Sequence, residues 1–126
     1  MALRLTPDEW HTRLYGQDID EMDHEKRHDL VESMLWEVAA RVLVLGVDVI
    51  LDFGCWMRSQ RDDMRMRAKQ LGVDFKMHFL DASEEILFAR LSERNAQSPE
   101  GAFRITESKL KEYMLFFEPQ FPELYV

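Results

Sequence analysis

The stretch VDVILDF, which spans Val47–Phe53, decides the fold more than any other part of this sequence. It is a short, nearly continuous run of apolar and β-branched residues that is broken only by Asp48 and Asp52. Runs of this kind are typical of strands that are buried on both faces of a parallel sheet. The pattern therefore predicts such a strand here, with Asp52 at its carboxyl end.

Signals on either side of this run predict further strands and helices. Strands are expected at Ala2–Leu5 and at Phe75–Leu80, the latter ending at Asp81. Thr6, Pro7 and Glu9 are typical of a helix start, with Thr6 as the cap. The predicted helices run from Thr6 to about Gly16, from about Met22 to Leu45, over Arg58–Leu71 before Gly72, from a cap at Ser83 to about Arg94, and from a cap at Thr106 to about Phe117.

The long predicted helix has an apolar stripe. Its apolar residues recur at steps of three to four, so they share one helix face, which we expect to pack on the core. The stripe consists of Leu30, Met34, Val38, Val42 and Leu45, and Gly46 is placed to end the helix.

Strands that alternate with helices predict a three-layer α/β sandwich with a parallel sheet and right-handed crossovers. No repeat or linker interrupts the 126 residues, so residues 1–126 are expected to form a single domain. Ligands of such sheets bind at the carboxyl ends of the strands. Asp8, Asp52 and Asp81 each follow a predicted strand, so we expect the functional site there.

Composition excludes several classes of protein. With 46% hydrophobic and 32% charged residues, the chain is too apolar for intrinsic disorder. Its net charge of -8 has the wrong sign for phosphate-backbone contacts, so nucleic acid is not an expected partner. Cys55 is the only cysteine, which excludes an internal disulfide and indicates a reducing compartment. No apolar run suits a signal peptide or a membrane span, so we expect a cytoplasmic protein without a membrane partner.

Five short segments carry a resemblance that extends over nearly all of the chain. They are TPDEW (Thr6–Trp10), VILDFG (Val49–Gly54), WMRSQR (Trp56–Arg61), FLDA (Phe79–Ala82) and ARLSERN (Ala89–Asn95). In this order the segments resemble the zeta-toxin-like and chloramphenicol-phosphotransferase-like P-loop kinases, which are AAA-family ATP-binding proteins. The resemblance implies a P-loop NTPase-like fold and an ATP-dependent phosphotransferase that acts on a small molecule.

The resemblance also implies roles for individual residues. Asp8 would take the proton from the acceptor hydroxyl, and Asp52 would hold Mg²⁺ through water, with ATP as the phosphate donor. This type of transfer depends mostly on positioning and electrostatics. Lid arginines would neutralise charge on the transferred phosphoryl group, and further residues would line the acceptor side. The lid residues are Arg90 and Arg94, and the acceptor-side residues are Trp56, Arg58 and Arg61.

The sequence departs from the family's pattern in one respect. P-loop kinases begin with a strand and the loop G-x-x-x-x-G-K-[ST], which holds the phosphates. None of the five glycines here is followed by lysine, and the chain starts where the family's second strand would be. We therefore expect an N-terminally truncated domain that is inactive alone and that binds no cofactor by itself.

The missing strand also predicts self-association. In these kinases it lies between the strands that correspond to Val47–Phe53 and Phe75–Leu80, so its removal exposes backbone groups on both. Unpaired buried groups cost about 1 to 3 kcal/mol each. A homo-oligomer formed by strand exchange is therefore expected. The sequence does not decide between a kinase fragment and a non-catalytic oligomeric interaction protein.

Residues His24–His28 match the zinc-hydrolase motif H-E-x-x-H, in which two histidines bind zinc and a glutamate activates water. The alternative is a solvated stretch of the long helix, because charged residues fill and flank the motif and no third ligand is evident. A zinc hydrolase is thus the third candidate function.

Two implied site assignments also have structural alternatives. Asp8 is in the first turn of a helix, where a carboxylate complements the helix dipole. Arg90 and Arg94 lie one turn apart, where they can pair with Glu93 or with the Glu84–Glu85 pair on a solvated face.

Overall fold

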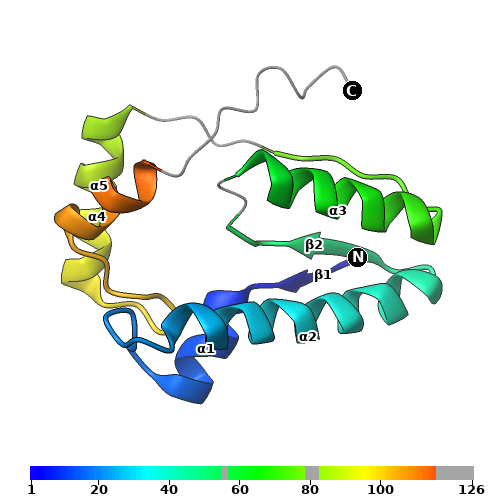
Figure 1. The fold of residues 1–126 in the computed structure, drawn as a ribbon, viewed down its shortest axis with the longest axis horizontal. Coiled ribbons are helices and arrows are strands. Elements are labelled where there is room, and N and C mark those ends of the chain that lie inside the picture. Colours follow the sequence, from blue (N-terminus) through cyan, green and yellow to red (C-terminus); the bar gives the residue numbers. More distant parts are fainter. Residues whose placement is uncertain (55–56, 79–82, 116–126) are drawn as a thin grey trace. The chain divides into compact units, whose positions relative to one another are not determined.

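The computed structural model describes residues 1–54, 57–78 and 83–115. Two compact units are present: residues 1–53 with 93–105, and the described parts of 54–92 with 106–126. The elements follow one another as β1, α1, α2, β2, α3, α4 and α5 (Figure 1). Among the described residues, no helix combines the length and the apolar character that are needed to cross a bilayer.

The sheet of the first unit consists of two parallel strands. β1 (Ala2–Leu5) pairs with β2 (Asp48–Leu51), and Ala2 lies opposite Asp48 in the register. One further backbone bond, from the Asp52 amide to the Leu5 carbonyl at 2.9 Å, continues the pairing past the strand ends. The α/β class with a parallel sheet is therefore confirmed, although β2 is shorter than the predicted Val47–Phe53.

Two helices connect the strands. α1 (Pro7–Tyr15) begins directly after β1, and α2 (His24–Val44) packs against both α1 and β2 (Figure 1). Thr6 occupies the predicted N-cap position. Its side chain makes no capping hydrogen bond, and the buried Thr6 hydroxyl has no partner in the described part of the chain.

The core of the first unit lies between the sheet and one face of α2. Leu5 from β1 meets Val31, Leu35 and Ala39, which follow one another at four-residue steps along α2. Half-buried side chains complete the layer, namely Leu3, Trp36, Val49, Leu51 and Phe53.

This core corrects the predicted stripe on α2. Leu30 and Met34 are 54% and 52% exposed, and Val38 is exposed as well. The period was right, but the phase was wrong by one residue. Apolar residues occupy two adjacent faces of α2, and the pattern alone cannot show which of these faces meets the sheet.

The second unit contains three helical segments that agree with the sequence. α3 (Arg58–Leu71) ends at Gly72 in the left-handed conformation, and α5 (Glu107–Met114) is capped by Thr106, which accepts from the Lys109 amide. α4 (Glu84–Gln97) begins in this unit and continues into the first one. Its predicted cap is also confirmed, since the Ser83 hydroxyl accepts from the Ile86 amide at 3.3 Å.

The predicted strand Phe75–Leu80 is not supported where it is described. Residues 75–78 have no strand conformation, and residues 79 and 80 lie outside the described part, as does Asp81. The apolar pattern of this segment is short, and strand formation depends on a neighbour to pair with.

Candidate functional site

Asp8 and Asp52 both follow the carboxyl ends of parallel strands. Asp52 comes directly after β2, and Asp8 lies in the first turn of α1, three residues after the end of β1. Because Leu5 and Leu51 are partners in the register, the two carboxylates belong to the same edge of the sheet. The expected edge location therefore holds for both residues.

Asp52 has an ion-pair partner at this edge. The Arg4 guanidinium donates to the Asp52 carboxylate at 3.0 Å and approaches Glu9 at 3.6 Å. All three side chains are more than half exposed, so these pairs contribute little to stability. The exposed Asp52 carboxylate stays accessible to solvent and ions.

Asp8 has a distinct electrostatic environment. Partial burial raises the pKa of the Asp8 carboxyl, and the charge of Asp52 adds to the rise, while His28 and Arg94 oppose it. The side chain is still 46% exposed, and its carboxylate lies 3.8 Å from the imidazole of His28. A partly buried carboxyl with a raised pKa is a stronger proton acceptor than an ordinary surface aspartate.

The two predicted lid arginines fall into different units. Arg94 is half-buried in the first unit, where it donates to the Phe103 carbonyl at 3.2 Å, and its Nε is buried without a partner among the described residues. Arg90 is exposed in the second unit. Within the described chain, neither arginine has an ion-pair partner among the carboxylates that the sequence suggested.

The predicted acceptor-side residues belong to the second unit. Trp56 lies outside the described residues. Arg58 is exposed on α3 and approaches Asp62 at 3.7 Å, whereas Arg61 is fully buried in the same helix. Of the two described arginines, only Arg58 presents its charge at a surface.

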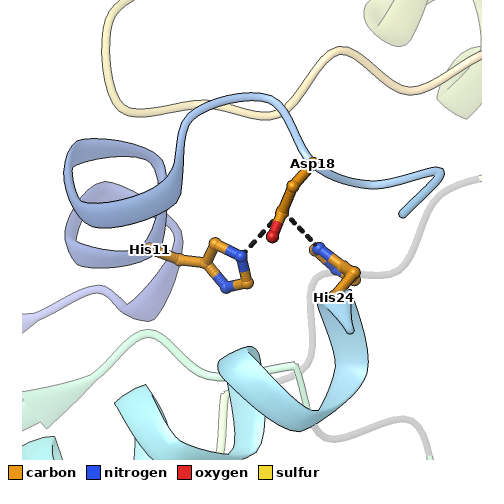
Figure 2. Close-up of side chains that lie close together, drawn as sticks. All are labelled: His11, Asp18 and His24. Carbon is orange, nitrogen blue, oxygen red and sulfur yellow. Dashed lines mark hydrogen bonds and ion pairs between the residues drawn. The ribbon is translucent and has the colours of Figure 1, made fainter. Parts of the chain in front are cut away.

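A second group of polar side chains is buried in the first unit (Figure 2). His11 comes from α1, Asp18 from the turn after it and His24 from the first residue of α2, and all three are buried. Asp18 Oδ1 accepts from His11 Nε2 at 2.8 Å and from His24 Nδ1 at 2.7 Å. The other oxygen, Oδ2, accepts from Arg27 Nη1 at 3.0 Å. We call these three residues, His11, Asp18 and His24, the His–Asp cluster.

These contacts determine the charge of Asp18. Burial alone would raise the pKa of Asp18, but the hydrogen bonds from His11, His24 and Arg27 outweigh it and hold that pKa well below its usual range. Asp18 is therefore ionised at neutral pH.

A third histidine extends the network outward. His28 Nδ1 lies 3.0 Å from His11 Nδ1, and His28 Nε2 lies 3.3 Å from Glu32. Burial would lower the pKa of His28, yet the hydrogen bond to Glu32 outweighs it and raises this pKa. The Phe103 ring makes T-shaped contacts with the rings of His11 and His24 at centroid distances of 5.0 and 5.1 Å, which adds apolar cover.

The His–Asp cluster differs from the H-E-x-x-H interpretation. His24 takes part, but Glu25 is exposed, and His28 is not among the described groups whose ligand atoms converge. Sequence reasoning missed His11 and Asp18. The available signal was that three of the four histidines fall within residues 11–28.

The chain matches a model of a known protein family. A family model described as AAA domain matches residues 1–120. No curated protein and no solved structure matches the chain.

Proposed function

This chain belongs to the AAA domain family, and from that premise we propose that it is the acceptor and lid part of an ATP-dependent small-molecule phosphotransferase. The P-loop kinases of the zeta-toxin and chloramphenicol-phosphotransferase type are the group whose motifs it resembles. Their three-layer α/β sandwich is the complete fold that we propose for it. Family membership supports a kinase-like, nucleotide-binding ancestry, and the finer assignment rests on the site.

The observation that carries the proposal is that Asp8 and Asp52 both lie at the same edge of a parallel sheet. An acceptor hydroxyl at this edge would give its proton to the Asp8 carboxylate, whose raised pKa suits a general base. The guanidinium of Arg94, which acts electrostatically on Asp8, would offset the negative charge that develops on a phosphoryl group. Arg58 is the described residue that we assign to the acceptor side.

The two expected ligands fit this chain unequally. Mg²⁺ prefers carboxylate oxygens and water. The exposed Asp52 carboxylate offers such an oxygen once its ion pair with Arg4 opens. A triphosphate needs backbone amides and a lysine, and none of the five glycines is followed by lysine. We therefore propose that this chain neither holds ATP nor transfers phosphate without a phosphate-binding loop from another segment.

Removal of the proposed base tests the assignment. In a version extended at its amino end by a strand, a G-x-x-x-x-G-K-[ST] loop and a helix, Asp8→Asn should lower the rate of phosphoryl transfer by about a hundredfold or more. Transfer is followed as ADP release in the presence of a panel of hydroxyl acceptors. Asp20→Asn, on an exposed carboxylate outside the sheet edge, is the matched control.

Equal loss in both variants, or no loss in Asp8→Asn, would contradict the role of Asp8. If no extended version shows any turnover while the wild-type chain assembles, the non-catalytic interaction protein becomes the better description.

We also propose that the chain associates with a second copy of itself. The described sheet contains only β1 and β2, so each strand has an edge that can accept another strand. Leu30, Met34 and Val38 add an exposed apolar face to α2. Strand exchange between copies, together with burial of this α2 face, would satisfy both surfaces.

Light scattering after size exclusion measures this association directly. The wild-type chain should elute as a dimer or larger species, and Met34→Lys should shift it toward the monomer. Asp29→Lys, at an exposed position on another face of α2, should leave the mass unchanged. A wild-type chain that is a monodisperse monomer of ordinary stability would exclude self-association.

A further inference from the structure

The His–Asp cluster is the feature that the phosphotransferase proposal leaves unused. We propose that His11, Asp18 and His24 form a binding site for a divalent transition-metal ion, with zinc as the best fit. One ligand atom from each of the three residues lies within 4.8 Å of the other two, and all three side chains are buried. In Figure 2 both imidazole rings are directed at the same carboxylate.

The ligand types select the class of metal. Two imidazole nitrogens and one carboxylate oxygen form a set that zinc accepts readily. Mg²⁺ and Ca²⁺ prefer sites made of oxygen atoms alone, so they fit this set poorly. A tetrahedral zinc ion with these three ligands retains one position for a water molecule.

The geometry needs only a small change to admit an ion. His11 Nε2 and His24 Nδ1 lie 2.8 and 2.7 Å from the same Asp18 oxygen, which is hydrogen-bond distance. Typical Zn–N and Zn–O distances are about 2.0 to 2.2 Å, so the three ligand atoms would move slightly apart around the ion. Asp18 belongs to the turn between α1 and α2, where such a movement disturbs no helix.

Outer contacts already orient two of the three ligands. Arg27 holds Asp18 Oδ2, which leaves Oδ1 facing the two histidines. His11 would bind the ion through Nε2, so its proton would reside on Nδ1, 3.0 Å from His28 Nδ1, which accepts this proton when the His28 ring is neutral. Such outer partners fix the tautomer and the orientation of metal-bound histidines.

The surroundings of the site differ from those of a hydrolytic H-E-x-x-H centre. Hydrolytic zinc in an H-E-x-x-H motif uses both histidines of the motif and its glutamate. Here Glu25 is exposed, and His28 contacts His11 instead of the converging ligand atoms. Bound zinc would tie α1, the turn after it and the start of α2 together.

Zinc titration by calorimetry tests the site on the full chain, prepared without a histidine tag and freed of metal. The wild type should bind one zinc ion per chain, and His24→Ala should weaken binding by at least about tenfold. His78→Ala, which changes the remaining histidine at an exposed position in the other unit, should bind like the wild type. Circular dichroism of each variant verifies that it is folded.

X-ray absorption on the wild type gives a second measurement that needs no variant. It should show two imidazole ligands at about 2.0 to 2.1 Å from the ion. The proposal is overturned if the folded wild type fails to bind zinc at micromolar concentration, if His24→Ala binds as tightly as the wild type, or if the spectrum lacks two imidazoles. Both readouts are independent of phosphoryl transfer.

Discussion

Asp18→Asn should lower the free energy of unfolding by about 3 kcal/mol, at the lower end of the range for breaking a buried ion pair, because the Arg27 partner is partly exposed. The carboxylate accepts from His11, His24 and Arg27, and its side chain is only 1% exposed. An asparagine amide has one oxygen and one NH₂ group, so it cannot accept on both sides. If the amide oxygen faces the two histidines, the NH₂ group faces the Arg27 guanidinium, so at least one donor of the network loses its acceptor.

Urea denaturation in the presence of a chelator measures this loss without any contribution from bound metal. Asp20→Asn is the matched control, because Asp20 is an exposed carboxylate two residues away, and it should change stability by less than about 0.5 kcal/mol. A loss in Asp18→Asn that is no larger than in Asp20→Asn would show that the His–Asp cluster does not stabilise the fold.

The pH dependence of the same measurement follows from the lowered pKa of Asp18. A carboxyl whose pKa is depressed by folding contributes stability that is present above its unfolded pKa, about 3.9, and is lost as the pH falls through the folded value. Wild-type stability should therefore fall on acidification below about pH 4, and Asp18→Asn should show a smaller fall.

Leu35→Ala should also cost about 3 kcal/mol, within the range for truncating a buried leucine. Leu35 is 1% exposed and lies in the middle of the α2 face that packs on the sheet. The substitution removes apolar contacts and leaves a cavity between α2 and β2. Thermal or urea denaturation at low micromolar concentration measures the change.

Leu30→Ala provides the control on the same helix. Leu30 is 54% exposed in the single chain, so the identical substitution should cost the monomer less than about 1 kcal/mol. If Leu30→Ala lowers stability more than Leu35→Ala, the stripe of Leu30, Met34 and Val38 would be the core face of α2. The face that contains Val31, Leu35 and Ala39 would then not be the buried one.

Local signals predicted most of the elements correctly. The strand Ala2–Leu5 and the helix Arg58–Leu71 agree with the sequence residue by residue, because turn residues and caps mark their ends. The phase of α2 could not be predicted, because apolar residues stand next to one another in the sequence and therefore occupy neighbouring helix faces. Leu30 precedes Val31, and Met34 precedes Leu35. Only the position of the sheet decides which of these faces is buried.

The sheet-edge residues and the His–Asp cluster differ in how far they could be predicted. Asp8 and Asp52 were predictable, because each follows a strand and parallel strands end at one edge. The contact of His11 with Asp18 depends on how the turn after α1 folds back on the helix, for which no spacing rule exists. The H-E-x-x-H spacing identified His24 as a candidate ligand but grouped it with Glu25 and His28. In the structure, the ligand atoms that converge with it belong to His11 and Asp18.

Calorimetry of Mg-ATP binding tests most directly the claim that this chain supplies the acceptor side of a phosphotransferase and lacks the phosphate cradle. The 126-residue chain should show no binding up to millimolar nucleotide, and the version extended by a strand, phosphate-binding loop and helix should bind. Tight binding of Mg-ATP to the 126-residue chain alone would show that the chain does hold a triphosphate and would contradict this claim.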